Sequence, residues 1–271
     1  MIDILFISGI VIPEALEENV YFNPYVYSVP ISSLYEYFKD RYNTKIFIPD
    51  IIKINYLNKI PEARIYAITF TYPEFLEVRK ITKFIKNKYP HSKIIIGGHH
   101  ATIFDRKTLD FTGCDYVVKG DGIQAIEAIL SNRELPPNVT TKNLNGKYIL
   151  DHYNLSSSMV LDKNAYYGLD WDKMFSNTVY DDNYKWIVTA KGCYYNCSFC
   201  SNKALSNCKI LYRNKDLIIK DINETLEYDD KAQLFLTEPL ASGKGSHRKY
   251  LNNLIERIYN ETPITTKNKL G

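Results

Sequence analysis

The first 130 residues alternate between short apolar runs and segments of helical spacing, and this alternation limits the possible folds more than any other feature. Five runs rich in β-branched and aromatic residues have the length and character of buried strands. These runs cover residues 2–8, 45–48, 65–71, 93–96 and 116–118. Strands that alternate with helices predict a parallel sheet with helices on both faces.

Three helices are expected between and after these strands. The first begins near Pro30, because proline suits the first helical turn, and its expected inner face holds Leu34, Tyr37 and Phe38. The second covers residues 74–89, and the third covers residues 123–131. The second has apolar residues at helical spacing, namely Phe75, Val78, Ile81 and Ile85.

Two of the expected strand ends carry candidate binding residues. In open parallel sheets, ligands bind beyond the carboxyl ends of the strands, where the strand order reverses. The third strand ends with the hydroxyls of Thr69 and Thr71, and the fourth runs into Gly97 and Gly98. Adjacent glycines allow a bulky ligand to approach the backbone closely, although by themselves they are more typical of a tight strand-to-helix turn. The following pair, His99 and His100, is interpreted as ordinary turn residues.

Composition excludes several classes of protein. The chain has 271 residues, of which 45% are hydrophobic and 24% charged, as in one large or two modest globular domains. The net charge of +3 gives no reason to expect a nucleic-acid partner. No apolar run reaches the roughly 18 residues of a membrane span, and the N-terminus lacks the features of a signal peptide. We therefore expect a cytoplasmic protein with no membrane partner.

The pattern of strands and helices becomes irregular in the middle of the chain. Residues 135–184 contain a Pro-Pro pair, several asparagines and a run of three serines, which predicts a linker with a small hairpin at residues 143–150. The expected domains are therefore residues 1–134 and residues 185–271.

Three of the five cysteines lie within eight residues, directly after an expected strand at residues 186–189. Cys193, Cys197 and Cys200 have the spacing C-x3-C-x2-C. Three thiolates can hold three irons of a four-iron cluster and leave the fourth iron open, as a catalytic metal site requires. The alternatives are a zinc site completed by Cys208 and three buried cysteines without a metal. Three neighbouring aromatic side chains are expected to shield a cluster from water: Tyr194, Tyr195 and Phe199.

This spacing, with a phenylalanine before the last cysteine, resembles the signature of the radical S-adenosylmethionine (SAM) enzymes. Residues 94–102 (Ile-Ile-Ile-Gly-Gly-His-His-Ala-Thr) and 114–122 (Cys-Asp-Tyr-Val-Val-Lys-Gly-Asp-Gly) resemble the cobalamin-binding domain fused to many of them. There the patterns are Gly-Gly-x-His-Ala-Thr and Asp-Tyr-Val-Val-x-Gly-Glu-Gly. The resemblance implies an α/β fold: a doubly wound, flavodoxin- or Rossmann-like sheet of five parallel strands, followed by an incomplete β/α (partial TIM) barrel.

The resemblance also implies cofactors and a reaction. The open iron of a [4Fe-4S] cluster would bind the methionine end of SAM, and an electron from the cluster would cleave the sulfonium to give a 5′-deoxyadenosyl radical. Members with cobalamin often transfer methyl groups, and they need an electron donor such as flavodoxin or ferredoxin. Implied SAM contacts are Phe199, Asn202 and Glu238, the last being equally well a turn carboxylate. Implied cobalamin contacts are Thr69, Thr71, Gly97 and Gly98.

The chain departs from the family pattern in one loop. Many cobalamin domains carry a cobalt-binding histidine after the first strand, but residues 9–17 contain none. Radical SAM relatives often lack it too, and some keep the fold without binding a corrinoid. Two further alternatives therefore stay open: a non-catalytic cobalamin- or nucleotide-binding module with a vestigial barrel, and a zinc-stabilised interaction protein.

The second domain is short for a complete barrel. Expected helices cover residues 217–226 and 247–260, an expected strand covers residues 232–236, and a third strand begins at residues 263–266. A six-unit barrel needs about 180 residues at roughly 30 per unit, whereas 86 remain from Trp186 onward. We therefore expect a truncated or split enzyme, with a second chain as a candidate partner to complete the barrel. The substrate and the oligomeric state do not follow from the sequence.

Overall fold

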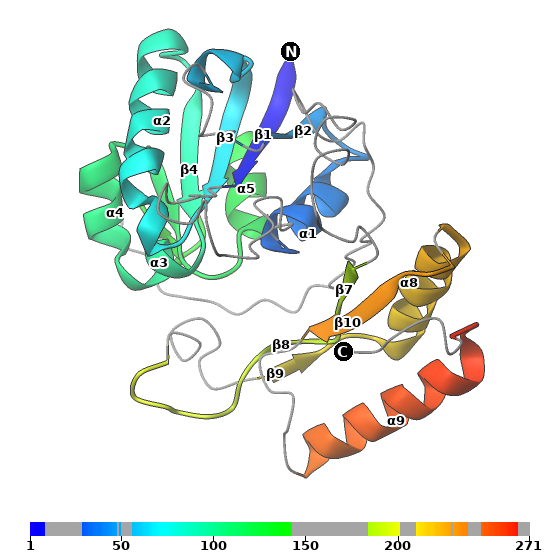
Figure 1. The fold of residues 1–271 in the computed structure, drawn as a ribbon. Coiled ribbons are helices and arrows are strands. Elements are labelled where there is room, and N and C mark those ends of the chain that lie inside the picture. The colour runs from blue at the N-terminus through cyan, green and yellow to red at the C-terminus, as the bar shows by residue number, and fades with distance from the viewer. Residues whose placement is uncertain are drawn as a thin grey trace, which may run out of the picture. The chain divides into compact units, whose positions relative to one another are not determined.

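The computed structural model describes residues 1–8, 29–47, 49, 56–142, 184–200, 210–228, 230–237 and 245–264. These residues fall into two compact units, one within Met1–Asp151 and the other within Asp172–Gly271 (Figure 1). The expected hairpin at residues 143–150 and most of the expected linker lie outside the described residues. The domain bounds at residues 134 and 185 therefore stay a prediction.

The first unit is built on one sheet with the strand order β2-β1-β3-β4-β5-β6. Its strands are β1 (Ile2–Ser8), β2 (Thr44–Phe47), β3 (Ala63–Thr69), β4 (Lys93–Gly97), β5 (Tyr116–Val118) and β6 (Val139–Thr140). The first five pair in parallel, and β6 adds an antiparallel edge. The order 2-1-3-4-5 is that of flavodoxin-like doubly wound sheets. The predicted fold class is confirmed for this unit.

Helices cover both faces of this sheet (Figure 1). One apolar core joins alternate strand residues such as Leu5 and Ile7 to α2 (Phe75–Lys88), α3 (His99–Ile103) and α4 (Asp105–Thr112). The other joins Ile4 and Phe6 to α1 (Val29–Phe38) and α5 (Ile123–Leu130). Single-turn helices η2 (Tyr56–Lys59) and η3 (Tyr72–Glu74) flank β3 along the chain. Successive strand residues point to opposite faces, so every central strand is buried on both sides.

The predicted inner faces are confirmed for α2 and partly wrong for α1. Val78, Ile81 and Ile85 of α2 are buried as expected. In α1, Phe38 is fully buried, but Tyr37 is 37% exposed. Helical spacing groups Phe38 with the buried residues three and seven positions earlier, and Tyr37 falls beside that face. Its hydroxyl donates to Glu127 at 3.1 Å instead.

The second unit contains two short strand pairs and two helices. Its elements are β7 (Tyr184–Val188), β8 (Ala190–Gly192), β9 (Ile210–Tyr212), α8 (Lys215–Tyr228), β10 (Gln233–Thr237) and α9 (Ser246–Glu261). β7 pairs in parallel with β10, and β8 pairs antiparallel with β9. A strand–helix–strand unit with parallel strands is what the start of a β/α barrel requires, and the barrel itself stays a prediction. Pro263 and Ile264 are not in a strand, and residues 265–266 lie outside the described part.

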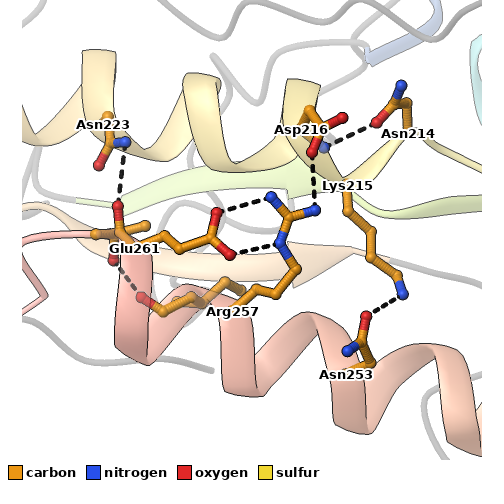
Figure 2. A network of polar contacts seen from close by, with 9 residues as sticks. Asn214, Lys215, Asp216, Asn223, Asn253, Arg257 and Glu261 are labelled. Atoms are coloured by element: carbon orange, nitrogen blue, oxygen red, sulfur yellow. Dashed lines mark hydrogen bonds and ion pairs between the residues drawn. The ribbon is translucent and has the colours of Figure 1, made fainter.

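The core of this unit is apolar, and a polar network lies on its surface. Ile187 of β7 packs with α8, β10 and α9 through buried residues, which include Ile218, Ile222, Leu226, Leu254 and Ile258. Helical spacing also predicts Leu251 on the inner face of α9, but this residue is only half-buried. Figure 2 shows the network, in which Arg257 bonds both carboxylate oxygens of Glu261 at 2.7 Å and contacts Asp216 at 2.8 Å. This pairing raises the pKa of Arg257 and lowers the pKa of Glu261. Such exposed pairs contribute little to stability, so the apolar core holds the helices together.

In the described part of the chain, no helix combines the length and the apolar character that crossing a bilayer demands.

Candidate functional site

The carboxyl edge of the first sheet is the first candidate site. The strand order reverses between β1 and β3, and ligands of doubly wound sheets bind beyond the strand ends at that point. Ser8 is paired in register with Thr69, and Thr69 with Gly97. Three neighbouring strands therefore end at the same level. Thr69 and Gly97 are half-buried, while Ser8, which the sequence analysis did not identify, is buried.

Gly98 is fixed by close packing against the end of β3. Its φ of +97° and ψ of −173° belong to a region that only glycine enters readily. A Cβ atom at this position would lie 2.5 Å from Oγ1 of Thr69 and 3.2 Å from the carbonyl oxygen of Phe70. Gly98 therefore forms the tight strand-to-helix turn that the glycine pair suggested. At Gly97 a Cβ atom would meet only the carbonyl oxygen of Val118 at 3.7 Å, so its backbone is the more open of the two.

Thr71 lies two residues beyond the end of β3, because this strand ends at Thr69 and not at residue 71 as expected. Thr71 is exposed, and its backbone N–H donates to the carboxylate of Glu74 at the end of η3. The structure thus brings Thr69 next to Gly98, while Thr71 belongs to the following turn.

The loops after β4 and β5 are joined by a side chain that sequence reasoning did not single out. The Thr102 hydroxyl donates to the carbonyl oxygen of Gly98 at 2.8 Å and accepts the backbone N–H of Gly120 at 2.9 Å. Asn138 then donates to the carbonyl oxygens of Lys119 and Asp121, at 3.0 and 2.9 Å. These bonds fix two glycine-containing loops relative to each other. Thr102 is the last residue of the Gly-Gly-His-His-Ala-Thr segment, and this motif is the sequence feature that could have identified it.

His100 is not an ordinary turn residue, and this expectation is wrong. It lies in α3, and its ring centroid is 5.1 Å from Phe70, 4.8 Å from Phe75 and 5.1 Å from Phe104. Burial among these rings lowers the pKa of His100, because the charged imidazolium is poorly solvated there. His99 begins the same helix and is exposed, as a turn residue would be.

Acidification should destabilise the fold through His100. Its folded-state pKa lies below the ordinary value of about 6.5, so the unfolded chain takes up the proton first as the pH falls. Stability is therefore lost progressively below about pH 6.5. We expect His100→Phe, which keeps an aromatic ring, to reduce the loss in free energy of unfolding between about pH 7 and about pH 5. Urea titrations followed by circular dichroism measure the free energy of unfolding at each pH. An identical loss in the variant and the wild type would contradict the prediction.

The second candidate site is the segment that carries Cys193, Cys197 and Cys200. Gly192 of β8 pairs with Ile210 of β9, so residues 193–209 leave and return between two paired strands. Cys193 is buried, and the other two cysteines are half-buried. The N–H of Tyr195 donates to Sγ of Cys193 at 3.4 Å, and the N–H of Cys200 donates to the carbonyl oxygen of Cys197 at 3.2 Å.

The donors of this segment fit an iron–sulfur cluster in kind, since clusters are held by cysteine thiolates. A cluster also requires that the three thiols point toward one place. Among the residues that the structure describes, no three His, Cys, Asp or Glu side chains are placed to hold one metal ion. The three thiols as ligands of one cluster therefore stay a prediction.

The surroundings of the three cysteines differ from expectation in one respect. Phe199 is 91% exposed, so in this conformation it does not shield the segment from water. The rings of Tyr194 and Tyr195 pack on each other with centroids 4.7 Å apart. Three further candidates, Asn202, Cys208 and Glu238, lie outside the described residues. The fifth cysteine, Cys114, is 3% exposed in the first core, and burial raises its pKa to about 12.

Comparison with known families supports the predicted resemblance of the first unit to a cobalamin-binding domain. Residues 50–130 match the B12 binding domain family. This range runs from before β3 to the end of α5 and contains Thr69, Gly97 and Gly98. No curated protein matches the sequence.

The fold is similar to those of solved structures that include two enzymes. The radical S-adenosylmethionine methyltransferase TsrM from Kitasatospora setae, solved with tryptophan and a SAM analogue, is 14% identical with a TM-score of 0.68. The match covers 95% of this chain and 51% of that one. The cobalamin-dependent SAM radical enzyme OxsB, solved with aqua-cobalamin and SAM, is 13% identical with a TM-score of 0.65, over 96% and 37% of the two chains. This chain thus spans about half the length of TsrM and less of OxsB.

Proposed function

We propose that this chain binds cobalamin at the carboxyl edge of its parallel sheet and a [4Fe-4S] cluster at Cys193, Cys197 and Cys200, and that it uses SAM in a cobalamin-dependent methyl transfer. One observation carries the proposal. The segment that matches the B12 binding domain places Thr69 and Gly97 at the strand ends of a fold shared with radical SAM enzymes. The substrate stays open.

The cobalamin part of the proposal rests on what the strand ends present. Thr69 offers a half-buried hydroxyl beside a turn that Gly98 keeps compact, and Gly97 offers backbone with little packed against it. Thr71, being exposed, would contact the outer part of the ligand. Cobalamin, when bound, supplies a cobalt that accepts and donates a methyl group. No histidine occurs in residues 9–17, so the proposal gives cobalt no protein ligand from that loop.

The cluster part of the proposal rests on the three thiols and their spacing. Three thiolates would hold three irons and leave one open to SAM. The cluster, when bound, supplies the electron that cleaves the sulfonium of SAM, delivered by a donor of the flavodoxin or ferredoxin class. The backbone at Phe199 and the side chains of Asn202 and Glu238 are the proposed SAM contacts. The protein's task is then to orient both cofactors and exclude water.

Anaerobic reconstitution with iron and sulfide, followed by aqua-cobalamin and gel filtration, tests the proposal. We expect the corrinoid absorbance to elute with the protein, together with about four irons and four sulfides per chain. Retained zinc without sulfide would overturn the cluster and favour a zinc-stabilised interaction protein. Bound cobalamin without any iron or zinc would favour the non-catalytic module.

A further inference from the structure

A tyrosine of the last described helix closes the base of the β8–β9 hairpin. The hydroxyl of Tyr250 in α9 lies between two carbonyl oxygens, that of Thr189 at 3.0 Å and that of Arg213 at 2.8 Å, and its one hydrogen is shared between them. Thr189 directly precedes β8, and Arg213 directly follows β9. The N–H of Arg213 also donates to the carbonyl oxygen of Thr189 at 2.9 Å. A single side chain therefore joins the two backbone segments that flank residues 193–209.

The side chain of Arg213 ties the same point to α8. Its guanidinium, with the side chain 1% exposed, lies 2.6 Å from the carboxylate of Asp221, which is also buried. Burial raises the pKa of Asp221, and the adjacent guanidinium opposes this rise. A buried charge that loses its partner is strongly destabilising. The end of β9 is thus held both by the Arg213–Asp221 pair and by Tyr250.

Ring packing holds Tyr250 in place. Its ring lies 4.4 Å from that of Tyr212, the last residue of β9, and the ring of Tyr212 lies 5.5 Å from that of His247. The Tyr212 hydroxyl is 3.3 Å from Nδ1 of His247, whose side chain is fully buried in α9. Packing against these rings therefore fixes the side-chain conformation of Tyr250 and, with it, the position of its hydroxyl.

We infer that Tyr250 is a positioning residue for the cysteine-bearing segment. It fixes the points at which residues 193–209 leave β8 and return to β9, and it does so from a helix that begins well after the last cysteine. Holding both ends reduces the conformational entropy that the segment loses when its thiols gather on a ligand. The consequence for cluster retention rests on the proposed function, whereas the bracing of the hairpin does not.

Tyr250→Phe tests the inference, because it keeps the ring and removes only the hydroxyl. The control is Tyr259→Phe, which removes a hydroxyl from a residue of the same helix that is 64% exposed. In the metal-free chain we expect hydrogen exchange at the amides of residues 190–192 and 210–213 to accelerate by about threefold to tenfold in Tyr250→Phe only. In the reconstituted chain we expect faster loss of iron to a chelator, again in Tyr250→Phe only.

The two measurements separate the possible failures. Equal exchange rates in wild type and Tyr250→Phe would overturn the inference. Faster exchange in a chain whose wild type takes up no cluster would uphold the bracing and defeat the proposed function. Faster exchange with unchanged iron loss would overturn the positioning role, because the hairpin would then be braced without effect on the thiols.

Discussion

Cys197→Ala is expected to abolish iron–sulfur cluster binding. Two thiolates, from Cys193 and Cys200, cannot hold three irons, and the cluster of the proposed site already leaves one iron without a protein ligand. Cys197 is half-buried, so its replacement by alanine removes little packing. The iron and sulfide content after anaerobic reconstitution should fall to background, and the visible absorbance of the cluster should disappear.

Two other cysteines provide matched controls for this loss. Cys114→Ala removes a thiol that lies in the first core and whose pKa is raised to about 12 by burial, so it should leave the iron content unchanged. Cys208→Ala should also leave it unchanged, because this cysteine is outside the C-x3-C-x2-C spacing. Wild-type iron and sulfide in Cys197→Ala, or their loss in Cys208→Ala, would contradict the ligand assignment.

Gly98→Ala is expected to destabilise the first unit and to remove cobalamin binding. A non-glycine residue at its backbone angles costs about 1–3 kcal/mol. The new Cβ atom would also lie 2.5 Å from the Thr69 hydroxyl, so the Thr69 side chain or the backbone around it would have to shift. Both changes occur at the strand ends proposed for the ligand. Urea unfolding and binding of aqua-cobalamin, followed by gel filtration, measure the two effects.

The adjacent glycine and Thr69 make this test specific. Gly97→Ala should cost much less stability, because its Cβ atom would lie at an ordinary 3.7 Å from the carbonyl oxygen of Val118. Thr69→Ala combined with Gly98→Ala should recover part of the stability, since the clash with the hydroxyl disappears while the backbone strain persists. Equal stability of Gly97→Ala and Gly98→Ala would contradict this account of the turn.

The sheet of the first unit could be predicted because its strands are continuous apolar runs buried on both faces. Of the five expected strands, β1 and β5 have the expected bounds and the other three differ by one or two residues at their ends, whereas β6 lies in the segment expected to be a linker and was not predicted. The helices α3 and α4 were not predicted, because their sequences are short and largely polar. The burial of His100 could not be read from sequence spacing, since two of its ring contacts, Phe70 and Phe75, lie 30 and 25 positions earlier in the chain.

The candidate site shows the same division between local and distant information. The nature of the donors, the glycine pair and the threonines at the strand end all follow from local sequence. The contact between Thr69 and Gly98 depends on strand register, and the bond from Tyr250 to Thr189 joins residues 61 positions apart. The strands β8 and β9, of three residues each, were not predicted. The brace of the hairpin therefore required the structure.

Electron paramagnetic resonance of the reconstituted and reduced chain, with and without SAM, tests the central claim most directly. An open iron bound to SAM predicts a [4Fe-4S] signal whose g values change when SAM is added, and no such signal in Cys197→Ala. A chain that holds zinc, or a cluster whose signal is the same with and without SAM, would contradict the claim.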